Sequence, residues 1–193
     1  MPLIGLGQEL GDYYKSNSNL KAKGLNFKIK TPLGFEQLEA DRPNIVQKWI
    51  KDRENTDLMQ TFLIGVKYLP LEATKAEWKD FLLNQDGIDF IIDSECDPYK
   101  EMGVPIKVIS KQFFVVDNCP GLYYETEHTI DMSERLPGID QKDRYLTTYT
   151  ITATLMMGEY NCTLSMSTFK KDVLNKKLFL KLTNSLVFID QWK

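Results

Sequence analysis

The chain has 193 residues, and its 24 Lys and Arg against 27 Asp and Glu give a formal net charge of −3. This length suits one domain with its own core, and the ordinary composition excludes collagen-like and low-complexity disordered proteins. The sequence has no basic excess or long basic run to neutralise phosphates, so nucleic acid is not expected as a partner. No stretch approaches the roughly 20 apolar residues of a membrane span, so no transmembrane segment is predicted.

The N-terminus has two interpretations. Gly5, Leu6 and Gly7 have the small-x-small form of a signal-peptidase site, with Gln8 as the new N-terminus. The residues before it are too few for a complete leader, which needs an apolar region of about 7–15 residues. We therefore interpret residues 1–23 as a leader remnant or a flexible N-terminal arm, which predicts an exported protein, periplasmic or secreted. A cytoplasmic protein with an apolar start is the alternative.

The first half of the chain predicts alternating strands and helices. Period-2 alternation indicates a strand over residues 24–30, which a turn with Pro and Gly ends. The apolar spacing in residues 41–50 predicts a short amphipathic helix. Residues 62–69 are apolar and β-branched, as in a second strand. A Thr-x-x-Glu capping box then opens a helix over residues 74–85, with Trp78, Phe81 and Leu82 facing inward and Gly87 as its stop.

The second half is rich in strands. Residues 104–116 and 122–130 predict two strands joined by a turn, and residues 145–157 and 160–169 form a hairpin across Gly158 and Glu159.

The chain is predicted to close with a helix over residues 172–187, in which leucines lie four apart and Asp172 is the N-terminal cap. Residues 24–193 therefore form a single α+β domain. Its expected architecture is an α/β/α sandwich in which helices flank both faces of a mostly antiparallel central sheet.

The order of several short motifs gives a family resemblance. Residues 24–35 (GLNFKIKTPLGF), a strand that runs into a Pro-x-Gly-aromatic turn, resemble the opening of PsbP-type α/β/α sandwich proteins. Residues 43–46, 68–70 and 183–188 are also similar in order, so the resemblance spans residues 24–190. Known members are mainly non-catalytic binding proteins without a shared active site. They include the extrinsic photosystem II subunit, a factor that releases nucleotide from the Ran GTPase, and bacterial exported proteins of unknown role.

The resemblance implies a non-enzymatic binding or accessory module for another protein, in the bacterial exported branch. Two other binding functions stay open. One is a carrier of a small apolar ligand, for which Met156, Met157 and Met166 would supply an adaptable lining. The other is an intracellular chaperone-like adaptor. Fold analogy alone does not choose among them.

Enzymatic function has one weak candidate. His128 is the only histidine, so a thiol hydrolase would have to pair it with Cys96 or Cys119, with Asn161 as the orienting group. No nucleophile signature surrounds either cysteine. We therefore predict no catalytic residues and no enzyme.

No metal or cofactor is predicted either. Asp93, Glu95 and Asp97 alternate as in a calcium loop, but Pro98 replaces the required Gly and Val104 the required Glu. We interpret this segment as a solvated acidic turn. The cysteines lack metal-ligand spacing.

Two of the three cysteines are candidates for a disulfide. In a meander, the turn at Cys119 and the turn before Cys162 fall at the same edge of the sheet. This placement predicts a disulfide between Cys119 and Cys162, within the roughly 4.4–6.8 Å Cα separation that such a bond needs. The alternative is that all three cysteines are small apolar core residues.

The last hairpin has an unusual hydroxyl-rich face, on which one strand carries Thr148, Thr150, Thr152 and Thr154 and its partner carries Asn161, Thr163, Ser165 and Ser167. Such a face is usually solvated. It could instead floor a polar groove under the helices or meet a partner. Tyrosines nearby would supply aromatic anchors. The predicted binding residues are Tyr123, Tyr145, Thr148, Thr150, Thr152 and Thr154.

Overall fold

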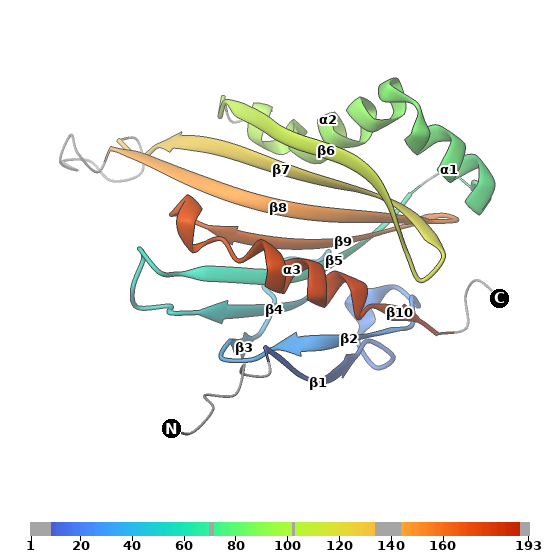
Figure 1. Ribbon diagram of the computed structural model, residues 1–193, viewed down its shortest axis with the longest axis horizontal. Coiled ribbons are helices and arrows are strands. Elements are labelled where there is room, and N and C mark those ends of the chain that lie inside the picture. Colours follow the sequence, from blue (N-terminus) through green and yellow to red (C-terminus); the bar gives the residue numbers. More distant parts are fainter. Residues whose placement is uncertain (1–8, 70–71, 102, 134–143, 190–193) are drawn as a thin grey trace, which may run out of the picture.

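The computed structural model describes residues 9–69, 72–101, 103–133 and 144–189. Within these residues the chain forms two antiparallel sheets, three α-helices and two short 3₁₀-helices (Figure 1). The pattern Gly5-Leu6-Gly7 lies outside the described residues, so export stays a prediction.

The larger sheet has seven strands and carries most of the molecule. Its spatial order is β3 (Glu36–Leu38), β4 (Ile45–Lys51), β5 (Gln60–Tyr68), β9 (Tyr160–Thr168), β8 (Tyr145–Met157), β7 (Cys119–Asp131) and β6 (Ile106–Val116). Every neighbouring pair is antiparallel. The predicted hairpin is confirmed as β8 and β9, with Thr150 opposite Ser167 and Met157 opposite Tyr160.

The smaller sheet joins strands from near the two ends of the described chain. Its order is β1 (Leu10–Lys15), β2 (Phe27–Pro32) and β10 (Val187–Phe188). The prediction of a flexible arm is therefore wrong for the described residues before residue 24. β1 pairs with β2, and Ser16 donates to the Leu25 carbonyl while accepting from the Phe27 amide, which ties this segment to the fold.

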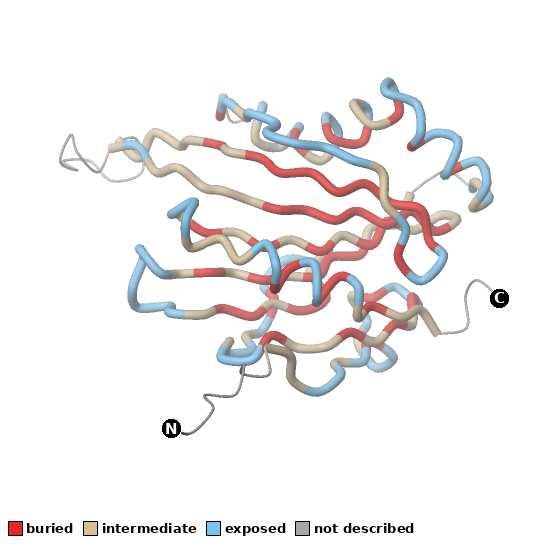
Figure 2. The backbone as a smooth tube through the Cα atoms, in the orientation of Figure 1, coloured by how far each residue is buried: buried red, intermediate tan, exposed pale blue. Residues whose placement is uncertain are grey.

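The helices lie against different faces of the larger sheet. α1 (Lys75–Leu83) and α2 (Gln85–Glu101) pack Trp78, Leu82 and Ile91 on the face that carries Tyr124 and Met156, which we call the α2 face. α3 (Lys176–Asn184) packs Phe179 and Leu182 on the opposite face, the α3 face, together with Phe27 of β2 and Phe62 of β5. Figure 2 shows the buried strands between these groups.

The predicted α+β class and mostly antiparallel sheet are confirmed. The expected α/β/α sandwich, with helices as the covering layer on both faces, is not confirmed, because strands of the small sheet make up part of one covering layer. The core on the α3 face is shared between one helix of nine residues and the small sheet.

The helix predicted over residues 41–50 is wrong, because this segment contains strand β4. A β-bulge between Ile45 and Gln47 adds one residue to the strand and reverses its alternation. Val46 and Trp49 consequently share the same core although they are three residues apart. This spacing imitates the period of an amphipathic helix.

The capping box that opens α1 is confirmed, but the chain continues as helix beyond Gly87. The Thr74 side chain accepts from the Glu77 amide, and the Glu77 carboxylate accepts from the Thr74 amide at 2.7 Å. α2 begins at Gln85, and a Cβ at Gly87 would overlap the Phe81 carbonyl oxygen. Glycine therefore permits the close turn from α1 into α2.

The C-terminal helix is shorter than predicted, and its cap is another residue. Asp172 lies in a 3₁₀-turn over Lys171–Val173, whereas Asn175 precedes α3 and its Oδ1 accepts from the Leu178 amide at 2.9 Å.

We expect Asn175→Ala to lower the free energy of unfolding by about 1 kcal/mol, because the variant loses this cap. Asp172→Ala is the matched control and should stay within about 0.5 kcal/mol of the wild type. Urea denaturation of the three proteins measures both differences. An Asp172→Ala loss equal to that of Asn175→Ala would contradict the assigned cap.

A second prediction concerns acid stability. Burial raises the pKa of Glu125 on β7, but hydrogen bonds from Lys176 at the start of α3 and from Tyr123 outweigh it, so the pKa is lowered overall. A carboxylate with a lowered folded-state pKa stabilises the fold above its ordinary pKa and loses this effect as the pH falls.

We therefore expect Lys176→Met to lower the Tm near neutral pH, and the gap from the wild type to close as the pH falls below the ordinary Glu pKa of 4.5. Lys177→Met, at the exposed neighbouring position, should leave the Tm nearly unchanged. Thermal melts over a pH series measure the gap, and a gap that persists in acid would exclude Glu125 as its cause.

Candidate functional site

The predicted hydroxyl-rich face exists and lies on the α2 face. Thr150, Thr152 and Thr154 stand opposite Ser167, Ser165 and Thr163. Their hydroxyls hydrogen-bond across the two strands at 3.0, 3.2 and 3.4 Å respectively. Such cross-strand pairs fix the orientation of the side chains along the ladder.

Part of this face is the floor of a hollow of about 430 Å³, which we call the polar pocket. Its floor includes Thr126, Thr150, Thr152, Thr163 and Ser165, from the three adjacent strands β7, β8 and β9. Its walls come from Glu95, Cys96 and Tyr99 of α2, from residues 42–45 before and within β4, and from Ile106 of β6. The polar groove that the sequence left open as an alternative is therefore present.

A partly exposed ion pair lines the polar pocket. Glu95 Oε1 accepts from Lys67 Nζ of β5 and from Asn161 Nδ2 of β9, both at 3.1 Å. Asn161 Oδ1 in turn accepts from the Thr163 hydroxyl at 2.8 Å. The positive charge of Lys67 is thus balanced inside the pocket wall.

His128 and Cys96 both line the polar pocket, but they do not form an activated pair. The His128 ring lies against Tyr99 with 4.8 Å between ring centroids, and burial lowers its pKa. Burial raises the pKa of the Cys96 thiol. A nucleophilic thiolate requires the opposite shift, and no hydrogen bond joins the two side chains among the described residues.

The predicted disulfide is not supported. Cys119 and Cys162 are both buried and free, and they share the core of the α3 face. They lie on β7 and β9, with β8 between them. Two strand spacings amount to about 9–10 Å, beyond the reach of a disulfide. The β6–β7 hairpin turns at Asp117 and Asn118, both with positive φ, so Cys119 already belongs to β7.

The tyrosines predicted for binding do not join the hydroxyl-rich face. Tyr123 is 8% exposed in the core of the α3 face and donates to Glu125. Tyr145 is 59% exposed and is the first residue of β8. Of the predicted threonines, Thr150 and Thr152 line the polar pocket, whereas Thr148 and Thr154 do not. Binding by any of these residues stays a prediction.

Two other expectations change with the fold. Asp93, Glu95 and Asp97 lie within α2 and not in a turn, and Lys100 pairs with Asp93 at 3.0 Å. Met156 is buried on the α2 face and Met157 and Met166 on the α3 face. The three methionines therefore do not line one cavity. No group of three potential metal ligands occurs in the described part of the chain.

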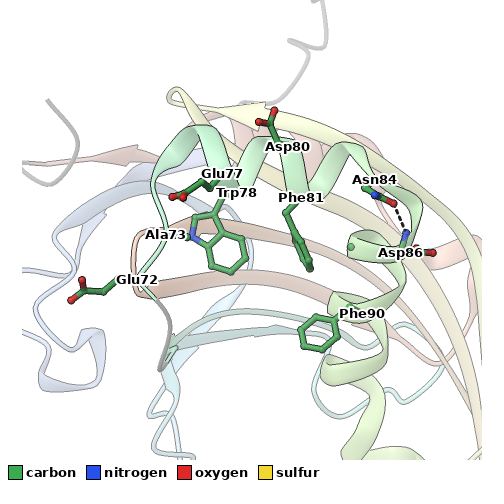
Figure 3. A pocket seen from close by; sticks show the side chains of 10 residues that line it. Glu72, Ala73, Glu77, Trp78, Asp80, Phe81, Asn84, Asp86 and Phe90 are labelled. Carbon is green, nitrogen blue, oxygen red and sulfur yellow. Dashed lines mark hydrogen bonds between the residues drawn. The ribbon is translucent and has the colours of Figure 1, made fainter.

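A second hollow, about 660 Å³, lies over the junction of α1 and α2 (Figure 3), and we call it the acidic-rimmed groove. The rings of Trp78, Phe81 and Phe90 lie in its middle, with centroid separations of 5.8 Å and 6.1 Å between successive rings. Four acidic residues also line the groove, Glu72, Glu77, Asp80 and Asp86, and the Asp80 carboxylate points away from the rings.

The aromatic residues of the groove differ in exposure, because Trp78 is held against the sheet whereas Phe81 and Phe90 reach solvent. Trp78 Nε1 donates to the Gly158 carbonyl at 2.8 Å, which fixes α1 to the turn between β8 and β9. Phe90 is 64% exposed, and Phe81 is partly exposed. Sequence reasoning assigned Phe81 to the core and did not consider Phe90. The aromatic residues of these helices span a wider arc than one buried stripe can cover. This spacing in the sequence could have indicated that some of the rings are exposed.

Comparisons with known proteins show the fold and no closer relationship. No family model matches the sequence, and no curated protein gives a significant match. The solution structure of cyanobacterial PsbP (CyanoP) from Synechocystis sp. PCC 6803 covers 98% of both chains with a TM-score of 0.54 and 13% identity. The Saccharomyces cerevisiae Ran-binding protein Mog1p covers 93% of this chain and 97% of its own, with a TM-score of 0.52 and 9% identity.

A structure of a point mutant of the protein Mog1 has the same coverage and gives a TM-score of 0.53 at 9% identity. The chain thus has a PsbP-like fold, as the sequence motifs suggested. No helix of the described residues is both long and apolar enough to cross a membrane.

The cysteine environments give a further testable prediction. Burial raises the pKa of all three thiols, that of Cys119 to about 11. We expect the native protein to leave all three thiols unmodified by iodoacetamide at pH 8, because the reactive thiolate is scarce and shielded. Unfolding in guanidinium should expose all three, as counted by mass spectrometry. Rapid selective alkylation of native Cys96 would contradict this prediction and support the alternative of a thiol hydrolase.

Proposed function

We propose that this protein is a non-enzymatic binding or accessory protein that holds a segment of a partner protein in the acidic-rimmed groove. The observation that carries the proposal is the Phe90 ring, which is largely exposed beside Phe81 in a groove that four acidic residues line. Exposed aromatic residues in a concave apolar surface are typical anchors of protein interfaces.

The charges around the groove specify the chemistry of the partner. Glu72, Glu77, Asp80 and Asp86 line it, and the described lining residues include no Lys or Arg. Hydrogen bonds from Thr74 hold the pKa of Glu77 below its usual range, so this carboxylate stays charged. The complementary occupant is an amphipathic segment that places apolar side chains on Phe81 and Phe90 and Lys or Arg side chains at the rim.

The fold comparison is consistent with a protein-binding function. Mog1p is named a Ran-binding protein, although its similarity to this chain extends to the fold alone. The alternative of an apolar-ligand carrier loses its proposed methionine lining, because those residues lie on opposite faces of the sheet. The raised pKa of the Cys96 thiol, which opposes a nucleophilic function beside His128, also favours a binding function.

Two labelled amphipathic peptides of equal leucine content test the groove, one with lysines and the other with glutamates as its polar residues. We expect fluorescence anisotropy to show binding of the lysine peptide, weaker at higher salt because exposed charges are screened. Phe90→Ala should weaken binding about tenfold, and Asp80→Lys should weaken it and reduce the salt dependence.

Leu180→Ala on α3 is the matched control, since Leu180 is a partly exposed helical residue on the other face of the sheet. Equal binding of both peptides, or equal losses in Phe90→Ala and Leu180→Ala, would contradict the proposal. In the host cell, a photo-crosslinking residue at position 90 should capture a partner that Asp80→Lys releases, whereas the same residue at position 180 should not.

A further inference from the structure

The polar pocket is lined by two mostly buried side chains whose polar atoms open into it and make no hydrogen bond to the described residues. His128 is 8% exposed and Thr126 is 7% exposed, and both line the pocket. Neither side chain makes a hydrogen bond with any residue that the structure describes, whereas Thr150, Thr152, Thr163 and Ser165 all do. The one fully enclosed side-chain polar atom without a partner among the described residues is Gln60 Oε1, so the polar atoms of His128 and Thr126 are open to the pocket. These two side chains are therefore available to hydrogen-bond whatever enters the pocket.

The charge of the pocket favours a neutral occupant. Lys67 is balanced by Glu95 in the pocket wall, and burial favours the uncharged form of the His128 imidazole by lowering its pKa. Arg42 is exposed and has no ion pair among the described residues. Arg42 is therefore the one unpaired positive charge in the described lining. A single exposed charge is too little to bind a multiply charged anion, and it disfavours a cation.

The lining also excludes a purely apolar occupant. Serine and threonine hydroxyls both donate and accept, and a neutral imidazole has one donor and one acceptor. A ligand that hydrogen-bonds all of these groups needs several closely spaced groups that can each both donate and accept a hydrogen bond. The rings of Tyr99 and Tyr124 and the side chain of Ile45 add apolar contact around this polar floor. Ligand pockets of about 300–1,000 Å³ suit small molecules, and this pocket lies within that range.

We propose that the polar pocket binds a small carbohydrate, a mono- or disaccharide whose hydroxyls hydrogen-bond Thr126, His128 and the Thr152–Ser165 pair while its apolar ring face packs against the tyrosines. Sugars combine closely spaced hydroxyls with an apolar ring face, which is the combination that the pocket presents. The pocket is distinct from the acidic-rimmed groove, since the two linings share no described residue.

The test is a titration of the ¹⁵N-labelled full chain with glucose, N-acetylglucosamine, maltose and glucuronate, followed by NMR. Concentrations up to about 50 mM detect millimolar dissociation constants. We expect at least one sugar to shift the amide resonances of Thr126, His128 and Thr152 together and saturably. Failure of all four to do so would overturn the proposal, as would inorganic phosphate or decanoate shifting these resonances at lower concentrations than any sugar.

Two variants separate binding from folding. Thr126→Val keeps the shape of the side chain and removes no side-chain hydrogen bond to the described residues, and His128→Phe keeps a ring against Tyr99. Each should weaken the sugar about three- to tenfold, as expected for one hydrogen bond, with the Tm retained. If one variant fails to fold, the other decides the outcome.

Thr147→Val is the matched control, because Thr147 pairs with Thr129 at 2.9 Å on the opposite face of the same two strands. This control should bind the sugar as the wild type does. Equal losses in all three variants, or unchanged affinity in Thr126→Val and His128→Phe, would overturn the assignment of the site.

Discussion

The antiparallel pairing of β8 with β7 and β9 is the constraint on which the rest of the molecule depends. Because side chains alternate along a strand, β8 places the hydroxyls of Thr150, Thr152 and Thr154 on the α2 face and Ile151, Ala153 and Leu155 on the α3 face. The apolar set forms the main core with α3. The hydroxyl set, tied across to β9, becomes the floor of the polar pocket.

The two hollows arise from the way in which α1 and α2 meet this sheet. Trp78 and Leu82 of α1 and Ile91 of α2 reach the buried strip around Leu122 and Met156. Farther along α2, Glu95 and Tyr99 face the hydroxyl-rich part of the sheet, and this part of the helix forms a wall of the polar pocket. On the outside, the close turn at Gly87 brings Phe81 and Phe90 together. One pair of helices thus shapes a polar surface beneath it and an aromatic surface above it.

Features governed by local alternation and short turns were predictable from the sequence. The β8–β9 hairpin, its hydroxyl-rich face and the α1 capping box were found because neighbouring residues determine them. β4 was mistaken for a helix because a bulge changes the spacing of Val46 and Trp49. α2 was missed beyond Gly87, where acidic residues and Pro98 resemble a loop. The walls of the pocket depend on long-range packing, so the sequence predicted its floor and not its enclosure.

The small sheet has a consequence for the order of folding. β2 is its central strand, and its two neighbours, β1 and β10, come from opposite ends of the described chain. During synthesis β1 can pair with β2 early, but the other edge of β2 waits until Val187 and Phe188 have left the ribosome. Contacts so distant in sequence form late and carry a large loop-closure cost. A nascent chain that stalls before residue 187 therefore keeps one edge of β2 unpaired and open to wrong pairing.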